Sequence, residues 1–170
     1  MNLRQINIQY EPEQDRLLMR ISSGANEEVA LWLTRRCVKL LWPALVNLAG
    51  SDPDLLTQSQ EAKSALLGIR HEEALARADF SRPYEAPAEH PLGTEPILVA
   101  KVQARRAEEG AFVLTLLPNK GQGVNLALDE KLLHSVCGLL QKVASNAEWE
   151  MKLEWPQASA SASAVQGRLN

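Results

Sequence analysis

The chain has 170 residues, of which 45% are hydrophobic and 23% charged, and its formal net charge at pH 7 is -3. A chain of this size and composition buries a core as one globular domain or as two small lobes, without help from a metal or a disulfide. The charge gives no general attraction to nucleic acid or to anionic lipid, and we expect neither a signal peptide nor a membrane span. We therefore predict a cytoplasmic protein without a membrane partner.

Residues 1–50 are predicted to form a three-strand meander followed by a helix. INIQY at 6–10 and VALWL at 29–33 alternate apolar and polar side chains with the period of half-buried strands, and RLLMRIS lies between them as a further strand. Thr34 is a good N-cap, and apolar residues then recur at helical spacing until Gly50. This region is the first β-β-β-α unit.

The same pattern returns at residues 96–147, which we predict as a second β-β-β-α unit. Adding 95 to each number aligns residues 17–49 with residues 112–144 without a gap and places Asp129 where Thr34 stands. The first strands align only if their hairpins differ by one residue. We therefore predict an α+β protein with an internal duplication, whose two units close around one core with a pseudo-two-fold axis.

Three further segments complete the predicted organisation. Residues 51–80 read as a connecting helix capped by Asp52, and residues 81–95 as a proline-rich loop. WEMKLEW, within residues 148–155, alternates without exception and predicts an extra strand, whereas residues 156–170 are predicted to be disordered. The apolar face of this strand is a candidate docking or dimer surface, formed by Trp149, Met151, Leu153 and Trp155.

Residues with catalytic or metal-binding chemistry are sparse. Cys37 and Cys137 fall in helical stretches and are predicted to be buried free thiols of a reducing compartment. His71, His90 and His134 lie in separate segments and match no zinc motif. We place His134 on the polar side of its helix and Cys137 beside the core, so that they do not form a nucleophile pair. The sequence thus predicts no catalytic residue, no cofactor and no metal.

The strongest candidate for a binding site is the side of the first sheet that faces away from its apolar stripe. An aromatic residue and two arginines on one sheet face are typical of a platform for single-stranded bases. The alternative is that the connecting helix, the other unit, the C-terminal strand or another subunit covers this face. Two more arginines lie in the first helical turn, where the dipole disfavours cations, so they either meet a partner's anion or stay solvated. The candidate binding face consists of Arg16, Leu18, Arg20, Trp32, Arg35 and Arg36.

Two resemblances add to this interpretation. QDRLLMR, LWLTRR and LLWP, in the first quarter of the chain, resemble an uncharacterised family of small proteobacterial proteins, which supplies no activity. The doubled sheet-then-helix plan is similar in outline to the PC4 and whirly single-stranded nucleic-acid binders. Their units have four strands before each helix, where we predict three, and their lysine- and aromatic-rich strand motif is not matched here. This resemblance implies a fold and no residue roles.

From these observations we expect a non-enzymatic adaptor or complex subunit that binds another protein or a second copy of itself. The alternative is a single-stranded nucleic-acid-binding module. A third hypothesis is an enzyme whose site the sequence does not reveal.

Overall fold

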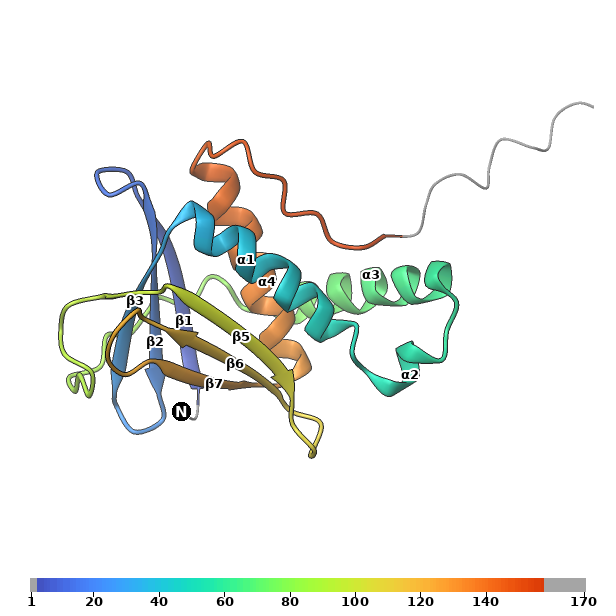
Figure 1. The fold of residues 1–170 in the computed structure, drawn as a ribbon, viewed down its shortest axis with the longest axis horizontal. Helices are drawn as coiled ribbons and strands as arrows, with labels where there is room; N and C mark the ends of the chain where they lie inside the picture. Colours follow the sequence, from blue (N-terminus) through green and yellow to red (C-terminus); the bar gives the residue numbers. More distant parts are fainter. Residues whose placement is uncertain (1–2, 158–170) are drawn as a thin grey trace, which may run out of the picture.

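The computed structural model describes residues 3–157 and contains two β-sheets and four helices within them. The predicted α+β class is confirmed. The sheets lie together on one side of the molecule, α1 and α4 pack against them, and α3 extends away on the other side (Figure 1). Apart from residues 156–157, the predicted disordered tail lies outside the described residues.

The first unit has the predicted meander and helix. Strands β1 (Leu3–Glu11), β2 (Arg16–Ser23) and β3 (Glu28–Leu33) pair antiparallel in that order. Helix α1 (Arg35–Ala49) begins directly after them, and the Thr34 hydroxyl accepts a hydrogen bond from the third residue of its first turn. The sequence therefore predicted each element of this unit correctly.

The second unit repeats the order, with one strand in two parts. Strand β4 (Ile97–Leu98) pairs parallel with β3 of the first sheet. After two residues the chain continues as β5 (Lys101–Arg106), which forms the second sheet with β6 (Phe112–Leu117) and β7 (Val124–Leu128). Helix α4 (Glu130–Asn146) follows. The predicted first strand of this unit is thus divided between the two sheets.

The register of the strands follows the predicted offset of 95 residues. Leu17 is opposite Leu33 in the first sheet, and the pair that the offset predicts, Phe112 opposite Leu128, occurs in the second. The hairpins before these pairs differ by one residue, since Glu11 is opposite Arg16 whereas Arg106 is opposite residue 112. The two halves therefore share one backbone plan.

Each helix packs against the first strand of the other unit. Helix α1 contacts β5, and helix α4 contacts β1. The backbone joins the sheets as well, because the Val99 N–H donates to the Trp32 carbonyl and the Ala100 N–H donates to the Leu117 carbonyl. Buried apolar side chains of both units form one cluster, so the halves share a single core.

The predicted connecting helix over 51–80 is wrong in one respect, because two helices occupy this region. Helix α2 (Pro53–Leu56) is capped by the Asp52 carboxylate, and helix α3 (Gln60–Arg77) has its own N-cap. The hydroxyl of Ser59 accepts from the Ala62 N–H, and this new cap allows the chain to change direction before α3.

The predicted strand at 148–155 is also wrong, although the burial pattern is as predicted. Trp149 and Trp155 are buried, and the charged residues between them are exposed. The residues do not pair with either sheet, and Glu148 and Glu150 have positive φ angles that interrupt an extended strand. We call residues 148–157 the C-terminal strap.

Side chains of the helices bind the backbone of the strap in place of a neighbouring strand. The Trp42 indole N–H donates to the Glu154 carbonyl at 3.1 Å, and the Gln141 amide donates to the Leu153 carbonyl at 2.8 Å. The indole N–H of Trp155 donates in turn to the Leu67 carbonyl of α3 at 2.9 Å. The strap therefore holds α1, α3 and α4 together.

We predict that Trp155→Ala lowers the free energy of unfolding by about 3–5 kcal/mol, because it leaves a cavity between three helices. The matched control Lys152→Ala changes an exposed strap residue and should stay within about 0.5 kcal/mol of the wild type. Urea unfolding of the full chain measures both. Equal stability of the two variants would show that the strap does not stabilise the fold.

Candidate functional site

The structure brings four of the predicted binding residues together on the outer face of the first sheet. Leu18 is directly opposite Trp32 across β2 and β3, and Arg16 and Arg20 flank Leu18 on the same side of β2. Leu98 of β4 lies beside Trp32 in the parallel pair and is 43% exposed. We use the name outer face for Arg16, Leu18, Arg20, Trp32 and Leu98.

Arg35 belongs to a different cluster. Its guanidinium carbon lies 5.9 Å above the ring of Trp149, whose indole N–H donates to the Asp15 carboxylate at 2.6 Å. That hydrogen bond, more than the nearby Arg35 charge, lowers the pKa of Asp15. Arg36 is exposed in the same helical turn. The predicted set of six residues is therefore divided, and Arg35 contacts the strap.

The proline-rich loop covers part of the outer side of the first sheet. The Tyr84 hydroxyl donates to the Glu28 carboxylate at 2.8 Å, and the Glu28 N–H donates to the Glu89 carbonyl at 2.7 Å. Burial and the Glu28 carboxylate raise the pKa of Tyr84. None of the four covers considered from the sequence was this loop. It reaches the sheet because α3 ends at Arg77 and the chain must return to begin β4.

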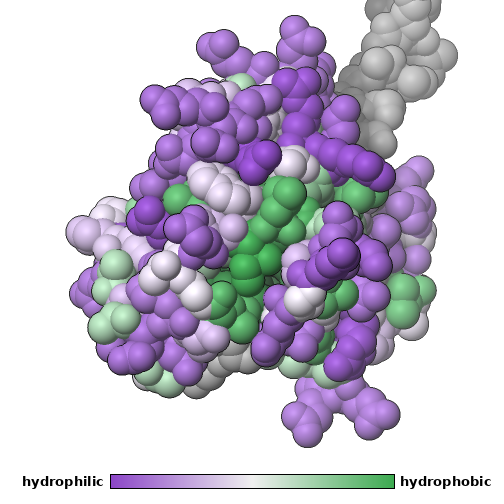
Figure 2. Space-filling model, turned by 60° about the vertical axis from the view of Figure 1, so that its left-hand side comes forward, coloured by the Kyte–Doolittle hydropathy of each residue, from purple (hydrophilic) through white to green (hydrophobic). Residues whose placement is uncertain are grey.

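The outer face is only partly accessible, since Leu18 is buried at 6% exposure. Trp32 is half-buried and Leu98 is exposed, and the outward side chains Val113 and Leu117 of β6 are half-buried. A space-filling view shows hydrophobic side chains gathered in a continuous stripe with hydrophilic side chains on both sides (Figure 2). An elongated apolar surface of this kind is typical of an interaction site.

Basic side chains accompany these apolar residues. Arg16 and Arg20 are partly exposed on β2, and Lys101 and Arg105 are exposed at alternate positions of β5. Register places Lys101 opposite Leu117, so both are on the outward side of the second sheet. The outer sides of both sheets thus combine apolar and cationic side chains, although the whole chain has a net charge of -3.

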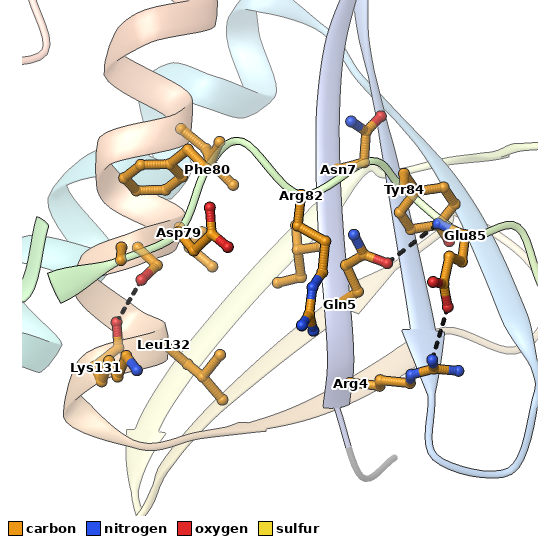
Figure 3. A pocket seen from close by; sticks show the side chains of 15 residues that line it. Arg4, Gln5, Asn7, Asp79, Phe80, Arg82, Tyr84, Glu85, Lys131 and Leu132 are labelled. Atoms are coloured by element: carbon orange, nitrogen blue, oxygen red, sulfur yellow. Dashed lines mark hydrogen bonds and ion pairs between the residues drawn. The ribbon is translucent and has the colours of Figure 1, made fainter.

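A separate cleft of about 420 Å³ lies between β1, α4 and the start of the proline-rich loop (Figure 3). Arg4, Arg82 and Lys131 are its cationic lining residues. Arg4 pairs with Glu85 at 2.7 Å, and the neighbouring Gln5 side chain donates to the loop backbone, so part of this polarity holds the loop on β1. The cleft offers cationic groups to an anion, but its own carboxylates compete for them.

Two histidines that the sequence kept apart meet in the structure. The Nδ1 atoms of His71 on α3 and His134 on α4 are 3.0 Å apart, and the two residues are 5% and 1% exposed. Burial lowers the pKa of both side chains, that of His134 to about 4. The placement of His134 on a polar, outward side was wrong, because α3 packs on that side of α4.

Gly138 is the sequence signal that was overlooked. A Cβ atom at this position of α4 would come within 2.5 Å of the Leu75 side chain of α3. A glycine inside a helix costs stability, so its presence indicates a close approach by another element. This glycine lies about one turn after His134 and marks where α3 packs.

The cysteines are buried and free, as predicted. Burial raises the pKa of Cys37 to about 11, which keeps its thiol protonated at neutral pH. Among residues 3–157, no three histidine, cysteine, aspartate or glutamate side chains are grouped so that they could hold a metal ion. Within the same residues, no helix has the length and apolar character needed to cross a membrane.

Comparisons of the chain with protein-family models, curated proteins and solved structures found no match. The resemblances drawn from the sequence therefore stay predictions.

We predict that Tyr84→Phe destabilises the protein by about 1–3 kcal/mol, because the buried Glu28 carboxylate loses a hydrogen-bond donor. Tyr10→Phe is the matched control, since it removes an exposed hydroxyl that donates to Asp15, and it should cost less than about 1 kcal/mol. Chemical unfolding compares the two variants. A larger loss in Tyr10→Phe would contradict the assignment of Tyr84 as the anchor of the loop.

Proposed function

We propose that the protein is a non-enzymatic adaptor or complex subunit, and that its outer face binds an extended segment of another protein. The segment that fits this surface is apolar with acidic residues. Such a protein acts by holding its partner, and no chemistry is required of its own side chains.

The exposure of Leu98, at 43%, beside the half-buried Trp32 is the observation that carries this proposal. The opposite side of the same strands is fully buried, with Leu31 and Leu33 inaccessible to solvent. The fold therefore has its core on the inner side and does not need a second apolar surface. Aromatic and aliphatic side chains on such a surface provide the anchors that dominate protein interfaces.

Charge supports an acidic partner. Arg16 and Arg20 border the apolar pair on β2, and Lys101 and Arg105 extend the cationic character along β5. Complementary charge around an apolar centre steers the encounter and selects the partner more than it adds affinity. Leu18, Trp32 and Leu98 lie side by side across β2, β3 and β4, and an apolar surface built on strands favours an extended segment over a compact domain.

A single-stranded nucleic-acid-binding module is the second candidate. Trp32 between two arginines has the composition of a base-stacking platform. The duplication does not supply a second platform, since Ala127 and Thr115 stand at the positions equivalent to Trp32 and Arg20. A continuous nucleic-acid track across both units is therefore less well supported than a one-sided protein site.

We predict that peptides selected on the full chain from a random displayed library are enriched in acidic and large apolar residues. Trp32→Ala should weaken their binding by about 30-fold, which corresponds to the roughly 2 kcal/mol expected of an aromatic anchor. Ile69→Ala is the control, because Ile69 is 53% exposed on α3, away from the outer face. Titration calorimetry of the selected peptides measures each variant.

Each other outcome contradicts the proposal in a different way. Peptides that lose affinity for Ile69→Ala and keep it for Trp32→Ala would move the binding surface to α3. A single-stranded oligonucleotide whose affinity falls steeply with salt, and depends on Trp32, would favour the nucleic-acid module. A dimer in sedimentation that Leu98→Arg dissociates would assign the face to a second copy of this chain.

A further inference from the structure

The histidine pair lies where α3, α4 and the C-terminal strap meet. The ring of Trp155 stacks on His71, with centroids 4.1 Å apart and 13° between the planes, and it meets His134 edge-on at 5.1 Å. Trp42 of α1 meets the Trp155 ring edge-on, with the ring centroids 6.0 Å apart. The strap therefore covers the two imidazoles with an aromatic ring.

Hydrogen bonds determine which nitrogen of each imidazole carries a proton. The Gln141 amide nitrogen donates to the Leu153 carbonyl, so the amide oxygen of Gln141 faces His71 Nε2 at 3.3 Å. An oxygen accepts only, and His71 Nε2 must therefore be the protonated nitrogen of that ring. His71 Nδ1 is then an acceptor, and His134 Nδ1 donates to it across 3.0 Å. Both histidines are neutral in this arrangement.

We propose that the His71–His134 pair is an acid-operated latch, which holds the C-terminal strap closed while both rings are neutral and releases it when the pair takes up protons. The hydrogen-bond chain leads from His134 through His71 and Gln141 to the Leu153 carbonyl. It connects the protonation state of α3 and α4 directly to the backbone of the strap. Trp155 connects the rings to the strap a second time, by stacking.

Protonation of either imidazole is disfavoured in the closed arrangement. An imidazolium ring carries N–H groups at both nitrogens, so a protonated His71 would point its Nδ1 proton at the Nδ1 proton of His134. A proton on His134 Nε2 preserves the contact between the rings but leaves a charge on a side chain that is only 1% exposed. Opening the strap hydrates the charge and removes this cost.

The surrounding charges do not offset this cost. Helix α3 contributes Arg70, Glu72, Glu73 and Arg77 near the pair, and helix α4 contributes Glu130 and Lys131. The Glu130 carboxylate lies 4.0 Å from His134 Nε2 but also pairs with Arg70 at 3.3 Å. The charged strap residues Lys152 and Glu154 are exposed on its other side. The numbers of cations and carboxylates around the pair are thus nearly equal, and the carboxylate nearest to His134 already pairs with Arg70.

The direction of the pH dependence follows from linkage. An open strap exposes histidines with a pKa near 6.5, whereas burial in the closed state lowers the pKa of His134 to about 4. The open state therefore binds more protons between these values, and closure weakens as the pH falls below about 6.5. From His134 alone, the ratio of open to closed molecules should rise about 30-fold between pH 7.5 and pH 5.

Fluorine NMR of the full chain labelled with 5-fluorotryptophan tests the latch. We predict that the Trp155 and Trp42 signals move toward solvent-exposed positions between pH 7.5 and pH 5, while the Trp32 signal on the outer face and the far-ultraviolet circular dichroism stay constant. A Trp155 fluorine signal that does not move between pH 7.5 and pH 5 would overturn the proposal. Movement of all tryptophan signals together would show global unfolding and would overturn it equally.

A double variant separates the latch from other acid effects. His71→Gln keeps a donor toward Gln141, and His134→Asn keeps a donor toward position 71, but neither side chain titrates. The Trp155 shift should be lost in this variant and retained in His90→Gln, which removes the histidine of the proline-rich loop. If the double variant does not fold, a carbon NMR titration of the His71 and His134 imidazoles in the wild-type chain tests the latch instead. Titration of His71 and His134 near pH 6.5 with Trp155 unmoved would refute the latch.

Discussion

The whole structure depends on the packing of each helix against the first strand of the opposite unit. A three-strand meander buries only one face, and its own helix leaves part of that face uncovered, so neither unit closes a core alone. The packing of α1 on β5 and of α4 on β1 covers the remaining apolar surface of both units. The continuous backbone at Val99 and Ala100 then joins the sheets. Loss of either helix would therefore expose the core of both halves.

Much of the fold was predictable from local patterns in the sequence. Alternation identified β1 and β3, and the caps at Thr34 and Asp129 correctly located the starts of α1 and α4. The 95-residue offset carried the register of one sheet to the other. Periodicity and capping are properties of neighbouring residues, so a sequence contains them directly. Four of the six predicted residues lie on one side of the first sheet for the same reason, because side chains on a strand alternate.

The errors concern contacts between segments that are distant in the chain. The strap has the alternation of a strand, yet it pairs with no strand, and the helices bind its carbonyls through Trp42 and Gln141. Alternating burial therefore does not show that a segment pairs with a strand, because the side chains of any extended segment point alternately to two sides. The covering of the outer side by Tyr84 and the meeting of His71 with His134 likewise depend on where α3 packs. Local patterns do not encode that placement.

The strap also explains where the two halves of the duplication differ. A chain has one C-terminal segment, so a strap can cross only one side of a pseudo-two-fold axis. Trp42 binds the strap, whereas its equivalent in the second unit is the fully buried Cys137. His134 lies beneath Trp155, whereas its equivalent in the first unit is the exposed Lys39. Trp42 and His134 thus break the symmetry where a single strap requires it, and the latch occupies one of the places where the duplicated halves differ.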